Sequence, residues 1–427
     1  MEARSAQQSL AGPVRGDVVR EALKLYRHLH RHPELSGTEE RTATAFAAKL
    51  RDVGFEVTTG VGGYGVVGRL GNGDGPTVLL RAELDALPMA ERTGLPYASE
   101  VVTQGDDGLR TPVMHACGHD LHLAALAGAA EGFAADRRSW RGTLLAVGQP
   151  AEETLTGAAA MVDDGLYRRW GRPDVALAQH CAPLPAGMVA HGDLMTAGCL
   201  TLEITIEGRA GHTAMPHLCV DPLVTAALVV VQLQTIRAQQ VDPAEPAVLN
   251  VGRICAGTRA NVIAESATIG VTMRAYSDAT LTRMREAVER VVRAACTAAG
   301  TPGDPRIAVV AHSPVNRPDP QVTAQLRVAH TEAFGAARVA GWPPSLAAED
   351  FPLFAADGVP TGYWMLGTIG PAQWRAAAGT AADKMAQIPA NHSSRYAPHA
   401  ALAVPTGIEA LTAAALVWLG RHPSPAP

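Results

Sequence analysis

The chemically richest segment of the chain is MHACGHDLH, residues 114–122, which holds one cysteine, three histidines and one aspartate. Cys117 lies two residues before His119, and Asp120 follows directly. Three interpretations are open: a metal site, a thiol nucleophile with its base, or a helix start that is rich in histidine. The segment alone does not decide between them, so further residues of a site must be sought elsewhere in the chain.

Polar residues also follow three short apolar segments that have the composition of buried strands. In chain order they are Glu83 and Asp85 after PTVLLRA, Glu152 and Glu153 after GTLLAVGQP, and His180 with Cys181 after PDVALAQ. Because parallel sheets collect their sites beyond the carboxyl ends of their strands, we expect these side chains to meet. Glu152 and Glu153 diverge on an extended or turning backbone, so one can bind a metal while the other reaches a bound water. The alternative is a solvated surface pair.

The elements that must position these residues alternate between helices and strands. Periodic apolar residues predict helices over 20–35, 39–54, 117–135 and 156–170, and apolar runs predict strands over 76–88, 142–149 and 173–180. Asp120 is the expected cap of the third helix. Continuous apolar strands separated by helices are typical of a parallel sheet. The expected fold class is therefore α/β, with helices flanking a mostly parallel mixed sheet.

The pattern changes near Gly198. Alternating apolar residues predict strands over 199–208, 247–257, 266–276 and 305–311, and helical periodicity predicts helices over 220–238 and 278–300. Asp278 is the expected cap of the second of these helices. The order βαββαβ is that of a ferredoxin-like module. The expected domains are an α/β domain of residues 14–197 and 312–427, an inserted domain of residues 198–311, and a flexible N-terminus of residues 1–13.

The composition is typical of a globular protein: of 427 residues, 47% are hydrophobic and 18% charged, which is enough for two domains with cores. The formal net charge is −5 and no segment is dense in Lys and Arg, which argues against nucleic acid or an anionic membrane as a partner. We expect no apolar run near the ~18 residues of a membrane span, no signal peptide, and a cytoplasmic location. The six scattered cysteines predict free thiols.

Six segments, taken in their order along the chain, resemble the dinuclear-metal aminoacylase and carboxypeptidase superfamily. They are HACGHD, QPAEE, AQH, GRAGHTAMPH, SLAAEDF and NHSSRY. The similar branch holds hippurate hydrolase, plant hydrolases of indoleacetyl amino acids and bacterial N-acyl-glutamine aminoacylases. The resemblance extends over nearly the whole chain. It implies a metallopeptidase-like catalytic domain and a lid and dimerisation domain formed by the inserted module.

The resemblance also implies two divalent metal ions per subunit, Mn²⁺, Zn²⁺ or Co²⁺, bridged by the thiolate of Cys117. His119 and His180 would complete one metal site, and Glu153 and His392 the other. A thiolate between two cations offsets their repulsion, and imidazole and carboxylate ligands suit these ions.

Several residues near the motifs receive other roles. By the same resemblance, Asp85 would orient a ligating histidine from behind and raise its basicity. His115 and His122 are expected to lie outside the ligand set. Glu83 departs from the branch, which more often has Asp at this position, and we do not assign it to the site.

The implied reaction is hydrolysis of an N-acyl amino acid. A water that bridges the metals would attack the amide carbonyl while Glu152 takes its proton and passes it to the leaving amine. His212, the first histidine of GRAGHTAMPH, would cross a dimer interface and stabilise the oxyanion in the partner's site. Asn261 and Arg274 are candidates for binding the amide oxygen and the carboxylate of the amino-acid half. The expected partners are thus a small N-acyl amino acid and a second copy of the chain, paired along the strand 199–208.

Two other functions stay open. The first is an amidase with Cys117 as nucleophile and His119 as base, although two residues at a helix start form a poor in-line pair. The second is a metal-binding relative without activity, against which the presence of Glu152 argues.

The substrate is the least determined feature. N-acyl-glutamine-like or neutral amino-acid substrates are expected from the resemblance, whereas aliphatic, aryl and indole-acyl groups all stay open. The acyl pocket is expected in the loops around residues 90–110 and 366–391. Residues 370–391 are weakly patterned and are expected to form a long loop beside the site.

Overall fold

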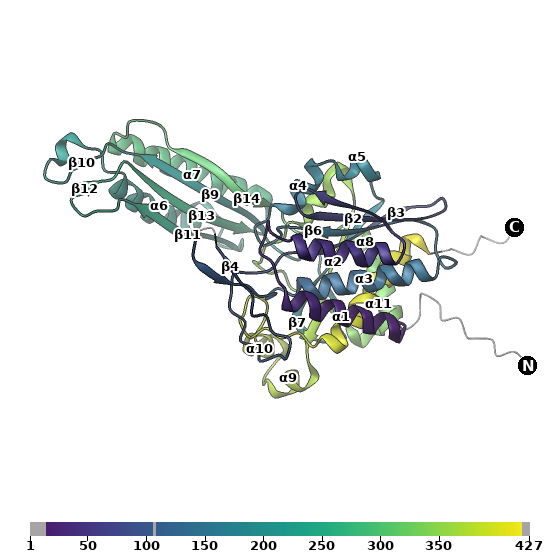
Figure 1. The fold of residues 1–427 in the computed structure, drawn as a ribbon. Helices are drawn as coiled ribbons and strands as arrows, with labels where there is room; N and C mark the ends of the chain where they lie inside the picture. Colours follow the sequence, from purple (N-terminus) through teal and green to yellow (C-terminus); the bar gives the residue numbers. More distant parts are fainter. Residues whose placement is uncertain (1–13, 106–107, 421–427) are drawn as a thin grey trace, which may run out of the picture. The chain divides into compact units, whose positions relative to one another are not determined.

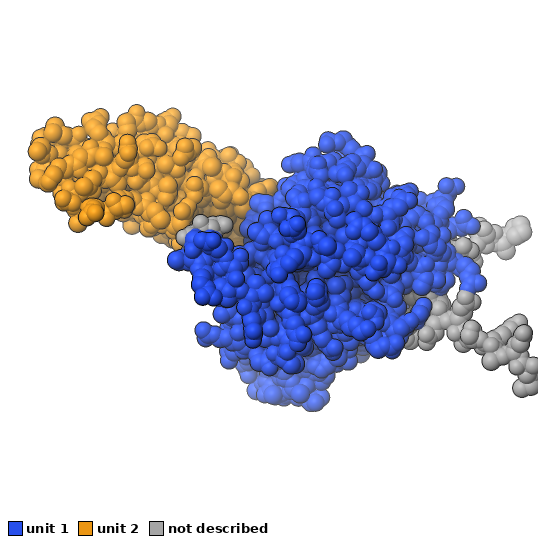
Figure 2. Space-filling model, viewed as in Figure 1, with its two compact units in different colours: residues 1–195, 318–343, 353–427 blue, residues 196–317, 344–352 orange. Residues whose placement is uncertain are grey.

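The chain folds into two compact units, which Figure 2 colours separately. The computed structural model describes residues 14–105 and 108–420. The first unit comprises Met1–Met195, Pro318–Pro343 and Leu353–Pro427, and the second comprises Thr196–Arg317 and Pro344–Pro352. The expected flexible N-terminus, residues 1–13, lies outside the described residues.

The boundaries of the second unit differ from those expected. Besides residues 196–317 it takes in the short segment 344–352, which we expected in the α/β domain. This segment joins the second unit because the backbone N–H of Ala197 donates to Ser345 O and Ala347 O, both at 3.0 Å. A pairing between residues so distant in sequence leaves no local pattern.

The first unit is built on an eight-stranded sheet of order β1-β2-β6-β3-β7-β16-β8-β15 (Figure 1). Its strands are β1 (Glu56–Val61), β2 (Gly65–Asn72), β3 (Thr77–Glu83), β6 (Gly142–Gln149), β7 (Val175–Pro185), β8 (Val189–His191), β15 (Val339–Gly341) and β16 (Thr361–Ile369). The pairs β3–β6, β3–β7, β7–β16 and β8–β15 are parallel. The expected mostly parallel mixed sheet is confirmed. Strands β3, β6 and β16 are almost wholly buried, which explains their continuous apolar residues.

Five long helices pack against this sheet or against one another. They are α1 (Gly16–Arg31), α2 (Glu40–Asp52), α3 (His119–Ala135), α8 (Pro320–Phe334) and α11 (Ala400–Leu419). Two shorter helices, α4 (Gly157–Asp163) and α5 (Leu166–Trp170), replace the single helix expected over 156–170. Gly165 lies between them with φ 87°, a left-handed conformation that a helix interior does not accept.

The region expected to be a long loop contains two short helices, α9 (Pro371–Ala376) and α10 (Ala381–Gln387). Thr380 and Asp383 form a capping box at the start of α10, which the weak apolar pattern of the segment did not indicate. A small hairpin of β4 (Val102–Gln104) and β5 (Arg110–Pro112) completes the first unit.

Helix α11 is long and apolar enough to cross a membrane by length and composition, so the expectation that no such run exists is wrong. However, 61% of its most apolar window is buried inside the structure. The helix packs against α3, α8 and β16, and it contributes to the main hydrophobic core. Core helices pass the same test, so this is weak evidence for a membrane span.

A buried pair of imidazoles joins β8 to α8. His191 Nε2 and His330 Nδ1 lie 3.0 Å apart, and His330 Nε2 lies 3.0 Å from the carbonyl oxygen of Ala410 in α11. Burial lowers the pKa of His191 to about 3, with His330 as a further cause, and lowers the pKa of His330 to about 4. Both rings are therefore neutral in the folded protein, and His330 donates from Nε2.

The second unit is an antiparallel sheet of order β11-β13-β9-β14 covered by two helices (Figure 1). Its elements are β9 (Gly198–Glu207), α6 (Pro222–Gln240), β11 (Ala247–Ala256), β13 (Ser266–Ala275), α7 (Asp278–Ala299) and β14 (Arg306–Ser313). This is the expected βαββαβ order. A two-stranded ribbon of β10 (Gly211–His212) and β12 (Val262–Ile263) extends it.

Two expectations about this unit are wrong. Strand β9 lies inside the sheet between β13 and β14, so it offers no free edge, and the edge strands are β11 and β14. Helix α7 is capped by Ser277, whose side chain accepts from Thr280 N–H, and not by Asp278. The Asp278 carboxylate instead accepts from Val315 N–H at 3.0 Å, a contact with the end of the module.

Candidate metal centre

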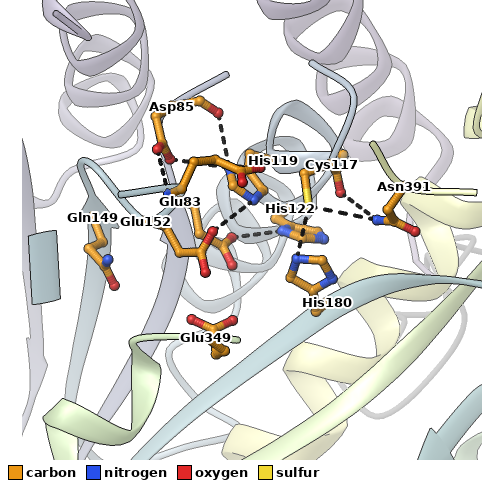
Figure 3. Close-up of polar contacts among 12 residues, drawn as sticks. Glu83, Asp85, Cys117, His119, His122, Gln149, Glu152, His180, Glu349 and Asn391 are labelled. Carbon is orange, nitrogen blue, oxygen red and sulfur yellow. Dashed lines mark hydrogen bonds and ion pairs between the residues drawn. The ribbon is translucent and has the colours of Figure 1, made fainter. Parts of the chain in front are cut away.

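A thiol, imidazoles and carboxylates from several segments of the first unit meet at the carboxyl ends of its parallel strands (Figure 3). The ligand atoms of Cys117, His119 and Glu153 all lie within 4.8 Å of one another. Cys117 Sγ is 3.4 Å from His180 Nε2, and Glu153 Oε1 is 3.4 Å from His392 Nε2. The structure thus brings together all five residues expected to bind metal.

The turn before α3 places Cys117 and His119 on the same side. Gly118 between them has φ 86°, and a Cβ at this position would lie 2.9 Å from Cys181 Sγ. Because only glycine adopts this conformation without strain and without that overlap, the residue between the two candidate ligands is set by both backbone and packing. His119 is the first residue of α3, and it is wholly buried.

Asp85 connects two of the ligand segments. Its Oδ1 lies 3.2 Å from His119 Nδ1, and its Oδ2 accepts from Ser36 Oγ at 2.7 Å and from Glu153 N–H at 2.9 Å. Burial alone would raise the pKa of Asp85, but the hydrogen bonds from His119, Ser36 and Glu153 lower it. His119 Nδ1 also lies 2.9 Å from the backbone oxygen of Asp85, so its proton is drawn to Nδ1, and Nε2 is directed toward the cluster.

The two glutamates after β6 diverge because the backbone turns sharply. Ala151 has φ 52°, a left-handed conformation that is uncommon for alanine. Its N–H donates to Glu39 Oε1 at 2.8 Å, and the same oxygen accepts from Gly37 N–H at 2.8 Å. Glu39 lies in the loop between α1 and α2. Nothing in the local sequence indicates this role, because the contact spans more than a hundred residues.

Glu152, the expected general base, is buried beside His119. It is 5% exposed, and its Oε2 lies 3.7 Å from His119 Nε2. The neighbouring Glu153 points toward His392 instead. The carboxylate of Glu152 therefore faces His119, and the carboxylate of Glu153 faces His392.

The cluster has the character of a site for cations. Among the described residues, the buried atoms His119 Nε2 and Glu153 Oε1 have no hydrogen-bond partner. Burial raises the pKa of the Cys117 thiol well above its usual range, and Glu153 and Glu152 raise it further. Burial lowers the pKa of His119, but Glu83, Asp85 and Glu153 outweigh it and raise the value to about 10. Divalent cations would satisfy these atoms and offset the negative charge, so the donor set fits Zn²⁺, Mn²⁺ or Co²⁺.

His122 lies near His119 and His180, and with them and Glu83 it forms a second group whose ligand atoms all lie within 4.8 Å of one another; its place outside the ligand set stays a prediction. Its Nδ1 lies 2.7 Å from Glu83 Oε2, and its Nε2 accepts from Cys181 N–H at 2.8 Å. Glu83, which we did not assign to the site, is wholly buried and also pairs with Arg81. Glu83 and His122 therefore hold the backbone just after His180. His115 is also buried, and its ring nitrogens form no hydrogen bond with the described residues.

Asp120 does not cap α3 as expected. Its Oδ2 lies 2.7 Å from His30 Nδ1, and the other ring nitrogen of His30 lies 3.1 Å from Glu91 Oε1. Burial lowers the pKa of His30, but the two carboxylates outweigh it and raise the value to about 10. A charged imidazole therefore links α1, the first turn of α3 and the loop after β3.

The residues expected in the second unit are not all together. His212 lies in β10 and Asn261 directly precedes β12, and both side chains are exposed; Ala214 N–H donates to His212 Nδ1 at 3.0 Å. Arg274 lies near the opposite end of β13, opposite Cys199, and it donates to Leu346 O at 2.7 Å. Since β13 has ten residues, roughly 33 Å of strand separates the ribbon from Arg274.

Comparison with known proteins gives consistent similarities. The model of peptidase family M20/M25/M40 matches residues 79–381. N-acetyl-L-cysteine deacetylase of Bacillus subtilis is 34% identical over 380 residues, which covers 87% of this chain and 86% of the relative. Hippurate hydrolase of Campylobacter jejuni is 36% identical over 280 residues, covering 65% and 70% respectively. A solved Bacillus subtilis protein described as a dinuclear metal binding peptidase from the M20 family matches with a TM-score of 0.69 and 25% identity, covering 94% and 99%.

Proposed function

The chain belongs to peptidase family M20/M25/M40, and from this premise we propose that it hydrolyses the amide bond of N-acyl amino acids to a carboxylic acid and an amino acid. Family membership and the cluster of ligands make it a metal-dependent amidohydrolase. The observation that carries the proposal is the meeting of Cys117, His119 and Glu153 beside the separately directed carboxylate of Glu152.

The five residues of the cluster would hold two divalent ions. Cys117 would bridge them, His119 and His180 would complete one set of ligands, and Glu153 and His392 the other. When bound, such ions polarise the carbonyl of the substrate and lower the pKa of a water molecule.

Glu152 would move the proton. Its carboxylate accepts a proton from the attacking water and then delivers it to the nitrogen of the leaving amine, so both transfers use one group. Its burial keeps bulk water from competing for that proton. His119 stays oriented during the reaction because Asp85 holds Nδ1.

The cysteine amidase is the less favoured alternative. A nucleophilic cysteine requires a lowered thiol pKa, whereas burial and two carboxylates raise the pKa of Cys117. The imidazole nitrogen that lies 3.4 Å from its sulfur belongs to His180, not to His119. Removal of metal by a chelator and recovery of activity with Mn²⁺, Zn²⁺ or Co²⁺ would distinguish the two mechanisms.

We also propose a dimer through the second unit. Its edge strand β11 packs beside α6, which exposes an apolar face. The exposed fractions are 47% for Leu223, 52% for Val224, 56% for Leu228 and 67% for Val231. Pairing of two β11 edges would bury this face, because a two-fold axis brings the same surface of both copies together. Light scattering should report a dimer, and Val231→Lys should weaken it.

His212 is proposed to serve the partner's site. Strand β9 leads away from Thr196, where the second unit begins, and its ten residues span roughly 33 Å before the ribbon with His212. Asn261 directly precedes β12 of that ribbon, whereas Arg274 lies at the other end of the unit. A substrate bound by both residues would therefore contact Asn261 of one subunit and Arg274 of the other.

Subunit exchange tests the role of His212 in trans. Glu152→Gln and His212→Ala homodimers should each be inactive, whereas their heterodimer has one site with both groups and should regain activity. A monomer in solution, or a confirmed heterodimer without activity, would exclude the role.

The substrate is tested with a panel of N-acyl amino acids on the metal-loaded protein, measuring release of the free amino acid. Acetyl, hexanoyl, benzoyl and indoleacetyl conjugates of Gln, Ala and Gly cover the open acyl classes, and the names of the relatives add N-acetylcysteine. We propose a glutamine-like or neutral amino-acid half and a cytoplasmic location. Full metal occupancy without hydrolysis of any conjugate would overturn the proposed function.

A further inference from the structure

The side chain of Asn391 contacts two other segments of the metal centre. Its Nδ2 donates to Cys117 O at 2.9 Å (Figure 3) and to Cys181 O at 3.2 Å. Cys117 precedes α3, and Cys181 directly follows His180 in β7. Asn391 itself directly precedes His392. One amide group therefore touches or adjoins three segments that carry candidate ligands.

The orientation of this amide follows from its neighbours. Both partners are carbonyl oxygens, which accept hydrogen bonds only, so the NH₂ side of the amide must face them. The two N–H bonds match the two acceptors. The same nitrogen lies 3.8 Å from Cys117 Sγ, within reach of a weak hydrogen bond to the sulfur.

The backbone beside Asn391 is held in an uncommon conformation. His392 has φ 65°, which is left-handed, and its N–H donates to Ala116 O at 2.8 Å. Such a conformation persists where surrounding contacts hold it. The hydrogen bonds of Asn391 and His392 both end on the segment before α3, so they hold the loop of His392 against the segment of Cys117.

We propose that Asn391 is a positioning residue of the metal centre, which holds the segments of Cys117, His180 and His392 in register for metal binding. The proposal rests on the metal site of the proposed function, but not on the identity of the substrate. By keeping the three segments together before metal arrives, the amide reduces the reorganisation that binding requires.

The chain offers a matched control in Asn72. Its Nδ2 also donates to two carbonyl oxygens, Arg137 O at 2.6 Å and Trp140 O at 2.7 Å, in the first unit. Asn72→Ala therefore removes the same kind of amide contact without touching a ligand segment. Asn391→Asp keeps the shape of the side chain but replaces both donors with an oxygen that faces two carbonyls.

Co²⁺ is the probe, because a thiolate ligand gives it a charge-transfer absorption in the near ultraviolet. Affinity is measured by competition with a chromophoric chelator, and melting temperature is measured on the metal-free proteins. We expect Asn391→Ala and Asn391→Asp to bind Co²⁺ about 10- to 100-fold more weakly, with an altered thiolate band. Asn72→Ala should lower the melting temperature at least as much as the Asn391 variants do. Its Co²⁺ affinity and its thiolate band should equal those of the wild type.

The outcomes separate this proposal from the function on which it rests. The positioning role alone is overturned if Asn391→Ala has the same thiolate band and the same Co²⁺ affinity as the wild type. Equal losses of affinity in Asn72→Ala and Asn391→Ala also overturn it, because the effect would then reflect general destabilisation. Absence of Co²⁺ binding by the wild type overturns the metal site and the positioning role together, whereas failure to hydrolyse N-acyl amino acids leaves this test unaffected.

Discussion

Asp85 holds two ligand segments through one carboxylate, so Asp85→Asn changes the metal centre without removing a proposed ligand. Its Oδ2 accepts two hydrogen bonds, from Ser36 Oγ and Glu153 N–H, while Oδ1 faces His119 Nδ1. An asparagine has one acceptor oxygen and one donor nitrogen. Whichever way the amide is turned, its NH₂ group faces either the N–H of Glu153 or the protonated Nδ1 of His119.

The magnitude follows from the bond that is lost. A hydrogen bond to a charged group in a buried site contributes about 1.5–3 kcal/mol, and the variant loses at least one. Because about 1.4 kcal/mol corresponds to a tenfold change in an equilibrium constant, metal affinity should fall by about 10- to 100-fold. The reduced ordering of His119 or Glu153 should lower kcat as well.

The assay is chelator competition with Zn²⁺ or Co²⁺, with metal content measured by atomic emission. Asp319→Asn is the control, because Asp319 caps α8 by accepting from Gln321 N–H and Val322 N–H and Asn is an equally good cap. The control makes the same chemical change and should bind metal as the wild type does. Wild-type affinity in Asp85→Asn would refute the reasoning, since the carboxylate of Asp85 would then not be needed to order His119 and Glu153 for metal binding.

Glu152→Gln should keep wild-type metal content while kcat falls by about two to four orders of magnitude, because it removes the proton acceptor but no proposed ligand. Steady-state kinetics measures kcat and atomic emission measures the metal content. Unchanged turnover would exclude Glu152 as the proton acceptor. Cys117→Ser should lose metal and activity together, since a hydroxyl is a poor bridging ligand. Full metal occupancy in this variant would make Cys117 a candidate nucleophile again. The metal-free protein should lose stability below pH 6.5, because the unfolded chain protonates His191 and His330 while the folded state, with pKa values of about 3 and 4, keeps them neutral. Below pH 6.5, each of the two histidines lowers the free energy of unfolding by about 1.4 kcal/mol per pH unit. Together they should therefore lower it by about 4 kcal/mol at pH 5 relative to pH 7. Urea denaturation would detect this difference. His330→Gln should reduce this pH dependence, and an identical dependence would assign it to other groups.

The site was predictable where residue type and local order carry the information. The strands that end before Asp85 and Glu152 are apolar runs bounded by polar residues, so their ends could be placed from the sequence, and parallel strands bring such ends to one edge. His180 lies inside β7, which continues to Pro185, five residues beyond the expected end of that strand. The βαββαβ order was predictable for the same reason, because each element has its own periodicity. Helix capping was less predictable, since Ser277 and Asp278 are adjacent and both are good caps.

Other features depended on which segments meet. The order β11-β13-β9-β14 puts β9 inside its sheet, although its alternating residues suit an edge equally well. Helix α11 is apolar because α3 and α8 cover it, and its composition alone does not distinguish this from lipid.

The sequence by itself determined the helices and strands that carry the candidate ligands, because these follow from periodicities of two and 3.6 residues, whereas the candidate ligands themselves were implied by the resemblance of the six segments to a known family. Asp85 was expected to support a candidate ligand, but only the tertiary structure decided that Glu39 and Asn391 contact the segments that carry the candidate ligands. Glu39 holds Ala151 and Asn391 contacts Cys117 and Cys181 across more than a hundred residues of chain. A hydrogen bond of this kind depends on the close approach of two loops, and that approach is set by sheet order and core packing, which no local pattern encodes.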